Sequence, residues 1–292
     1  MQNMMTTGDE LQPLLPAELE KEIFEVSALS DLRLIPNLVL VSKRVKIWLE
    51  PLLYRCLSIS HEDFRNRHSE IVRMSSYEFV QILDTKTASF LRDHVHHLAL
   101  TSLSDAAVEC ALSSCTGIRS LAIFQVEPNP TFLPLIQAVP LVRLSINIGQ
   151  LCDPGTHFEP STFLHLTHFE IFGTDARPSV CWAGDLSLLP ALTHLLIYPS
   201  PEGIHKSTFR AILALCKSLE VLVRLVGDEQ DVANYTDFGD DFRAVTLLTG
   251  KFLRNWEKGV LRGEDYWFLA DAFVHGRRTG RIPASNYAIP PN

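Results

Sequence analysis

The chain has 292 residues, enough to bury a sizeable core in one or two domains. Its 46% hydrophobic and 21% charged residues are ordinary for a globular protein and exclude a mainly disordered chain. The 26 basic and 34 acidic residues give a formal net charge of −8, so no basic excess is present to neutralise phosphates, and we expect no nucleic-acid partner.

The start of the chain and the cysteines bear on the compartment. Residues 1–12 are polar and lack both the basic start and the apolar centre of a secretory signal, and we expect a flexible tail. No apolar run approaches the roughly 20 residues of a membrane span. The six cysteines include no C-x-x-C pair, which favours reduced, buried thiols over disulfides or a metal site. We therefore expect an intracellular protein, in the cytoplasm, the nucleus or both, without membrane contact.

Residues 13–56 predict a compact group of helices. Pro16 suits the first position of a helix, where a missing amide costs no hydrogen bond. The residues after it form an apolar stripe at helical spacing, made of Leu19, Ile23, Phe24 and Leu29. A second helical run covers 38–49 and is expected to stop at Pro51. A segment of this length can bury few large apolar side chains by itself. Some of its apolar side chains should therefore contact the rest of the chain or a partner.

Specific dipeptides and spacings mark this stretch: Leu15-Pro16, Glu18, Ile23-Phe24, Leu38, Val41-Ser42, Lys43-Arg44, Trp48 and 51–55. The pattern resembles an F-box, and closely the variant found in large families of mushroom-forming fungi. It departs from the family after the basic pair, where Val45 replaces the usual tryptophan and Trp48 follows one turn later. The resemblance implies binding to a Skp-type linker and, through it, to a cullin–RING ubiquitin ligase. The linker-binding residues that it implies are Leu15, Pro16, Ile23, Phe24, Leu38, Val41 and Val45.

From residue 57 the chain predicts strands that alternate with helices. Residues 57–60 alternate like a short strand, and Ser75 and Glu78 have the spacing of a capping box. From residue 95 an apolar motif recurs at steps of 23 to 27 residues, within the range of leucine-rich repeats. Its central residues are Leu98, Leu121, Leu144, Phe169, Leu195 and Leu222. Cys115 and Cys216 end helical runs, which resembles the cysteine-containing repeats often attached to F-boxes.

We expect residues 57–227 to form a right-handed α/β solenoid of leucine-rich-repeat type, with parallel strands on its concave face. Side chains alternate along a strand, so the neighbours of the central residues point into the concavity. They mix aromatic and charged groups suited to holding a protein substrate. The candidates for substrate binding are Phe124, Arg143, His168, Glu170, Phe172, His194 and Tyr198. A register shift of one residue would instead bury the aromatic side chains in the core.

Residues 228–292 are expected to form an acidic loop, a helical cap and a frayed end. The last repeat strand has an apolar outward row that needs a cover, made of Val221, Val223 and Leu225. Beyond the acidic residues between 228 and 241, the runs 245–259 and 263–278 predict helices rich in aromatic residues. Solenoids require end caps, and these two helices are predicted to supply one.

No pattern for catalysis is found, since G-x-S-x-G, H-E-x-x-H and glycine-rich phosphate loops are absent from the sequence. We expect no enzyme activity, no cofactor and no metal. His97, His168 and His194 recur at one repeat position and favour a polar ladder over metal ligands.

The sequence is therefore interpreted as a substrate-recognition adaptor of a Skp–cullin–F-box ubiquitin ligase. Two alternatives stay open. One is a scaffold whose first helices seal the end of the solenoid. The other is a sensor that binds a small molecule between the concave face and the cap.

Overall fold

The computed structural model describes residues 15–61, 71–127, 129–147, 159, 163–172, 179–198, 206–227, 241–248 and 252–289. The predicted flexible tail, nearly all of the predicted acidic loop and the last three residues lie outside these ranges. The chain divides into two compact units, which we call the helical unit (residues 1–53) and the repeat unit (residues 54–292).

The helical unit contains α1 (Ala17–Ser30), the 3-10 turn η1 (Leu32–Leu34), α2 (Ile35–Leu38) and most of α3 (Lys43–Tyr54). α1 begins one residue later than expected, with Pro16 as its N-cap and Ala17 at the first helical position. The predicted stop at Pro51 is wrong, because this proline lies inside α3. The helix continues because Leu52 and Leu53 pack against the core of the unit, which offsets the hydrogen bond that proline removes. The fully buried part of that core is Ala28, Ile35, Val45 and Leu49.

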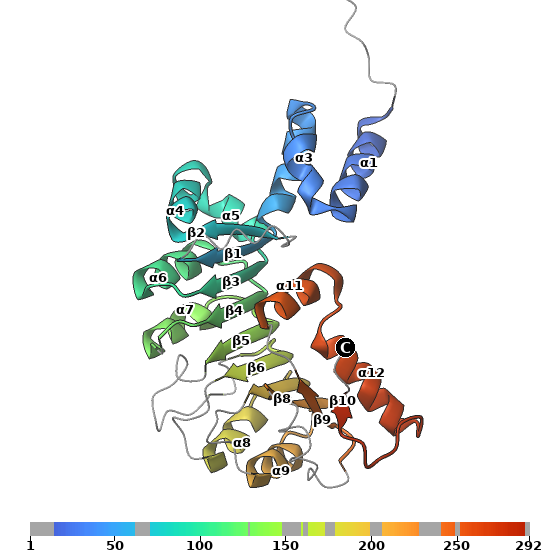
Figure 1. Cartoon of the computed structure of the whole chain (residues 1–292). Helices are drawn as coiled ribbons and strands as arrows, with labels where there is room; N and C mark the ends of the chain where they lie inside the picture. Colours follow the sequence, from blue (N-terminus) through green and yellow to red (C-terminus); the bar gives the residue numbers. More distant parts are fainter. Residues whose placement is uncertain are drawn as a thin grey trace, which may run out of the picture. The chain divides into compact units, whose positions relative to one another are not determined.

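The repeat unit is a mixed α/β structure on one sheet of ten strands, in which all neighbouring strands are parallel (Figure 1). The order across the sheet is β10-β9-β8-β7-β6-β5-β4-β3-β1-β2. The strands are β1 (Cys56–Ser60), β2 (Val72–Ser75), β3 (His97–Thr101), β4 (Ser120–Phe124), β5 (Arg143–Asn147), β6 (His168–Phe172), β7 (His194–Tyr198), β8 (Val221–Val226), β9 (Ala244–Leu248) and β10 (Ala288–Ile289). From β3 to β10 each strand lies beside the next one in sequence, as expected for stacked repeats.

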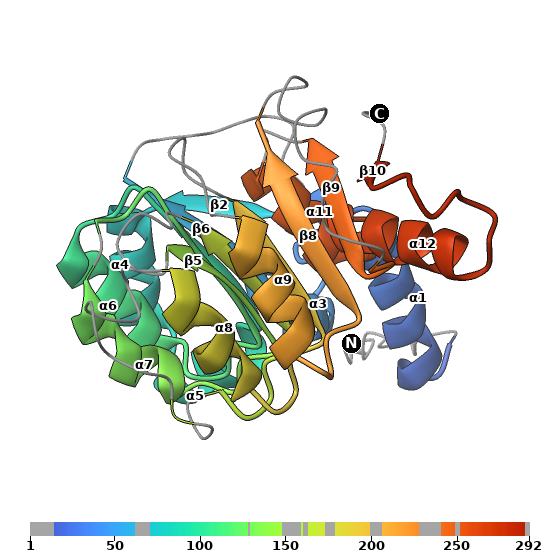
Figure 2. The ribbon, with the colours of Figure 1, turned by 90° about the horizontal axis from the view of Figure 1, so that it is seen from below.

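Helices cover one side of the sheet, which we call the outer face (Figure 2). The elements between the strands are α4 (Ser76–Thr85), α5 (Ala88–His94), α6 (Asp105–Ser114), η2 (Pro130–Phe132), α7 (Leu133–Gln137), α8 (Ser179–Ser187) and α9 (Lys206–Leu215). α4 begins with the predicted capping box: the Glu78 amide donates to Ser75 Oγ at 3.2 Å, and Glu78 Oε2 accepts from the Ser75 amide at 2.8 Å.

The core between the sheet and the outer helices is a ladder of large apolar side chains. The six predicted central residues are register partners on adjacent strands, and all of them are fully buried. Leu57 extends the ladder on β1. The strand period and the register read from the sequence are therefore confirmed, and the side chains on either side of the ladder residues point to the opposite face. We call that opposite side, which carries Ala99 and its partners on the other strands, the inner face.

The C-terminal region differs from the expectation in two ways. Residues 244–248 form strand β9 instead of the start of a helix, because Val245 and Leu247 extend the apolar inner face beside β8. The helices that follow, α11 (Phe252–Arg262) and α12 (Tyr266–Arg278), lie across the inner face and not at the end of the sheet (Figures 1 and 2). β10 forms that end.

Candidate interaction surfaces

One apolar surface of the helical unit is exposed. Leu15, just before α1, and Leu19, Ile23 and Val26 on one side of α1 recur at steps of three or four residues, and they are 45%, 49%, 54% and 62% exposed. They line a shallow depression of about 410 Å³. We call this row the α1 stripe. Large apolar side chains grouped in this way are typical of a surface that binds another protein.

The seven linker-binding candidates divide by exposure. Leu15, Pro16, Ile23 and Val41 are exposed, whereas Phe24 and Leu38 are half-buried. Val45 is fully buried in the core of the helical unit, so it stabilises that unit and offers no contact area. The exposed large apolar residues among residues 15–53 that the sequence interpretation left out of the candidates are Leu19, Val26, Leu29, Leu34, Leu40 and Ile47. Helical spacing from Leu15 was the signal that could have identified the first two.

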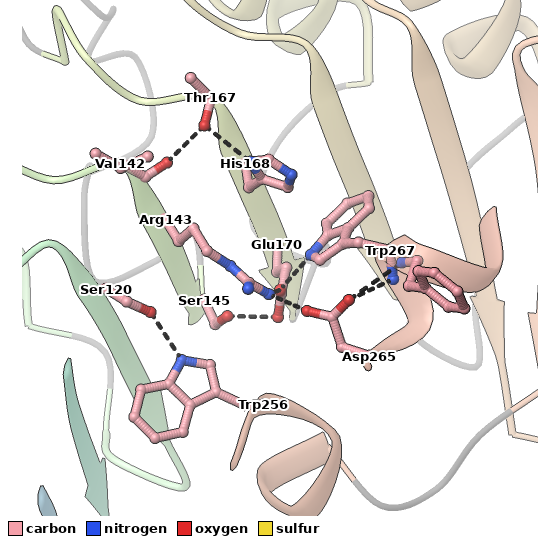
Figure 3. Close-up of polar contacts among 11 residues, drawn as sticks. Ser120, Val142, Arg143, Ser145, Thr167, His168, Glu170, Trp256, Asp265 and Trp267 are labelled. Carbon is pink, nitrogen blue, oxygen red and sulfur yellow. Dashed lines mark hydrogen bonds and ion pairs between the residues drawn. The ribbon is translucent and has the colours of Figure 1, made fainter. Parts of the chain in front are cut away.

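On the inner face, polar side chains from successive strands bond to α11 and α12 (Figure 3). Trp256 of α11 donates from Nε1 to Ser120 Oγ on β4 at 3.1 Å. Arg143 of β5 donates from a terminal nitrogen to Asp265 Oδ2 at 2.6 Å. Asp265 is also the N-cap of α12, where it accepts from the amides of Trp267 and Phe268. The strand side chains thus fix the start of α12 directly.

Glu170 of β6 is the buried centre of this network, with 1% of its surface exposed. It accepts from Trp267 Nε1 at 2.9 Å and from Ser145 Oγ, and Arg143 lies 3.7 Å from its carboxylate. Burial raises the pKa of Glu170 above its ordinary value, while the Arg143 guanidinium opposes the shift. The carboxylate therefore links β5, β6 and α12 through hydrogen bonds and charge.

Two histidines lie beside this network. The rings of His168 and His194 stack with centroids 4.2 Å apart and planes 10° from parallel, and Trp267 meets both rings edge-on. His194 Nε2 lies 3.0 Å from Asp271 Oδ1 of α12. Burial lowers the pKa of His168 to about 3, helped by the neighbouring His194 and Arg143. The His168 ring is therefore a neutral packing group in the neutral pH range.

The remaining substrate-binding candidates are aromatic and also meet the C-terminal region. Phe172 contacts Phe124 with ring centroids 5.5 Å apart and Phe252 of α11 with centroids 5.1 Å apart. Tyr198 contacts the same Phe252 at 5.2 Å. The edge-on geometries are those that aromatic pairs favour.

The structure thus brings all seven substrate-binding candidates onto one face, which agrees with the predicted alternation. Their partners there are the chain's own side chains, chiefly Trp256, Asp265, Trp267 and Asp271. The sequence interpretation placed the helices that carry these residues at the end of the solenoid. The expectation that this region covers the outward apolar row of Val221, Val223 and Leu225 is confirmed, because α12 packs against that row. The spacing of the helical runs did not indicate that the two helices would also reach β4, β5 and β6.

Metal ligation, membrane insertion and thiol chemistry are further properties of the described ranges that bear on function. Among these residues no group of three or more His, Cys, Asp and Glu side chains is placed to hold a metal ion. Within the same ranges, no helix combines the length and the apolar character needed to cross a membrane. Cys56, Cys110, Cys115 and Cys216 are free thiols, and burial raises the pKa of Cys115 to about 12 and that of Cys216 to about 11. The other two cysteines lie where side chains are not described.

The chain was compared with models of known protein families and with curated proteins, and its sequence matches none of them.

Proposed function

We propose that this chain is a substrate-recognition adaptor of a Skp–cullin–F-box ubiquitin ligase, in which the helical unit binds a Skp-type linker and the repeat unit carries a protein substrate. The proposal gives this polypeptide no chemical step. Its contribution to ubiquitin transfer is proximity, because it holds a substrate lysine near the conjugating enzyme.

The observation that carries the proposal is the α1 stripe. Among residues 15–53, the described part of the helical unit, four are completely buried, while Leu15 just before α1 and Leu19, Ile23 and Val26 on one side of it stay exposed. At roughly 25 cal/mol per Å² of apolar surface, covering such a row would favour association. Association and ordering costs prevent a direct conversion of this area into affinity.

The resemblance of residues 15–55 to an F-box supplies the class of partner. The exposed Leu15, Pro16, Ile23 and Val41 are among the residues for which the resemblance implies linker contact. Val45 is left out of the proposed contact because it is buried, and Leu19 and Val26 take its place.

The test is co-expression of the chain with a Skp-type linker, followed by size-exclusion chromatography. The wild-type chain should elute together with the linker. The variant Leu15→Asp with Ile23→Asp should elute alone, because two charges placed on the α1 stripe would have to be buried in the complex. Circular dichroism and thermal unfolding of the variant verify that both units remain folded.

The matched control places the same two charges on α4, with Tyr77→Asp and Val80→Asp, where the wild-type side chains are 71% and 49% exposed. This control should still elute with the linker. A wild-type chain that elutes alone contradicts the adaptor proposal and favours a scaffold. Equal binding by both double variants assigns the contact to another surface.

A further inference from the structure

The inner face has two chemically different halves. One row of register partners begins with small side chains on β1, β3, β4 and β5, namely Ser58, Ala99, Ala122 and Ser145. The same row continues on β7, β8 and β9 with Leu196, Val223 and Val245. Small side chains leave space above the sheet that close packing requires another group to fill. The half formed by β1, β3 and β4 is therefore shaped to receive a large side chain from outside the sheet.

Trp256 of α11 fills this space. Its side chain is 1% exposed and packs with Cys56, Ile71, Ala99 and Ala122. Its indole N–H donates to Ser120 at the edge of the same site. We call the surface formed by Cys56, Ile71, Ala99, Ser120 and Ala122 the indole site. It recognises both the size of an indole and its single donor.

A charged contact lies next to the indole site. Arg73 of β2 donates from Nε to Glu257 Oε1 at 3.0 Å, and the two side chains are 17% and 8% exposed. Glu257 follows Trp256 directly in sequence. α11 thus presents two neighbouring groups to the sheet: the indole of Trp256 enters the indole site, and the carboxylate of Glu257 pairs with the guanidinium of Arg73.

α11 is held differently from α12. Five buried side chains of α12 pack into the large apolar row of β7, β8 and β9. From α11 Trp256 is the one fully buried apolar side chain, with Leu253, Val260 and Leu261 partly buried beside it. Phe252, at the start of α11, is partly buried against Phe172 and Tyr198. The outward side of α11 carries Arg254, Lys258 and Arg262, all exposed. Gly263, with φ of +69°, ends α11 before the cap of α12 and lets the backbone turn where other residues would be strained.

Two side-chain atoms of β3, the strand that carries Ala99, have no hydrogen-bond partner among the described residues. Within the described ranges, His97 Nδ1 and Thr101 Oγ1, both on β3, are buried without a hydrogen-bond partner. A buried polar group in this state costs about 1–3 kcal/mol.

We infer that the indole site is a docking site for a partner helix that presents a tryptophan followed by an acidic residue, and that α11 occupies it as an internal substitute. α11 opens while α12 and the sheet stay folded, and the partner helix takes its place. The inference deepens the proposed function by naming the class of substrate segment that the inner face accepts. The indole site itself does not depend on linker binding.

Cys56 provides a direct measurement of this opening. It lies under Trp256 in the indole site, whereas Cys115 and Cys216 are buried in the core on the outer face. The native chain is treated with N-ethylmaleimide, and each cysteine is followed by mass spectrometry of peptides. Local opening of α11 makes Cys56 react at least about tenfold faster than the other two. Equal rates at all three cysteines mean that the site opens only on global unfolding, and they overturn the inference.

A charge variant adds a second readout. Glu257→Gln removes the ion pair with Arg73 and should accelerate the labelling of Cys56 alone. Glu264→Gln, an exposed carboxylate beyond the end of α11, is the matched control and should leave the rate unchanged. Equal effects of the two variants overturn the assigned role of the pair.

Binding in trans tests the class of ligand. The probe is a fluorescent peptide of residues 251–263, and the control peptide carries Trp256→Ala. The full-length variant Trp256→Ala should bind the probe at least about tenfold more tightly than wild type, because the internal competitor is weakened. Equal binding of both peptides, or equal affinity of both proteins, overturns the inference.

If Trp256→Ala fails to fold, the full-length Glu257→Gln variant replaces it with the same expectation. The linker co-elution assay is independent of all these measurements. Failure of the docking inference and failure of the adaptor proposal are therefore distinguishable.

Discussion

Removing the Arg143 guanidinium should destabilise the repeat unit strongly. Arg143→Met keeps a side chain of similar length but leaves the carboxylates of Glu170 and Asp265 without their cation, 3.7 Å and 2.6 Å away in the wild type. Glu170 is completely buried and Asp265 is nearly so. Breaking a buried ion pair from one side costs about 3–5 kcal/mol, because the remaining charge stays desolvated. This is a large part of the 5–15 kcal/mol by which a domain is stable.

Glu170→Gln is the matched control. A glutamine keeps an acceptor for Trp267 and removes the buried charge, so we expect a cost of about 1 kcal/mol. In the Glu170→Gln background, Arg143→Met leaves only one uncompensated carboxylate. The double variant should therefore be more stable than the sum of the single effects predicts, by about 1–3 kcal/mol.

Urea unfolding followed by tryptophan fluorescence measures these differences, because Trp256 and Trp267 are both buried on the inner face. The reasoning is refuted if Arg143→Met costs less than about 1 kcal/mol, or if its cost is the same with and without Glu170→Gln. Either result would mean that water reaches the network and screens its charges.

Three further predictions concern pH, backbone contact and the core. Burial lowers the pKa of His168 in the folded chain to about 3, from an ordinary value of 6.5. Between these two values the unfolded chain binds a proton at this ring and the folded chain does not. The contribution of the neutral ring to stability is therefore complete above pH 6.5 and is lost as the pH falls from 6.5 toward 3. The stability difference between wild type and His168→Phe should therefore change by up to about 1.4 kcal/mol per pH unit between pH 6.5 and 5, and a constant difference in urea titrations would contradict this. Gly259→Ala should destabilise the chain in thermal unfolding, since the added Cβ would lie 2.2 Å from Asp265 Oδ2. Gly184→Ala, in open space on α8, is the control and should stabilise the chain by about 0.5–1 kcal/mol. Equal effects of the two variants would argue against the close contact. Leu121→Ala in the middle of the apolar ladder should cost about 2–5 kcal/mol in urea unfolding, and a cost below about 1 kcal/mol would place this residue outside a close-packed core.

The sequence was sufficient to predict β1 and the six strands from β3 to β8, because the pattern that marks them is local, whereas β2, β9 and β10 were not predicted. Leu98, Leu121 and Leu144 recur at nearly constant steps, and the alternation around them determines both the ladder and the opposite face. Residues 245–248 were wrongly assigned to a helix. A short apolar run fits a helix and a buried strand equally well, so the pattern alone does not distinguish them. Only pairing with β8 resolves that ambiguity.

The contacts of the inner face could not be predicted in this way. Arg143 and Asp265 are 122 residues apart, and Trp256 and Ser120 are 136 apart. Periodicity shows that a helix has an apolar side, but it does not show which of several apolar surfaces will receive it. The position of α11 and α12 on the inner face depends on tertiary packing, in which large helical side chains fit against small residues of the strands.

The ten-stranded sheet ends at β10, which has only two residues and is followed in sequence by Pro290 and Pro291. An open strand edge is a template on which another chain can add hydrogen bonds and begin to aggregate. A two-residue strand offers little of that template, and prolines have no amide hydrogen to donate. This margin of the protein is therefore protected against uncontrolled self-association, and lengthening β10 with alternating valine and threonine should make the protein form insoluble assemblies.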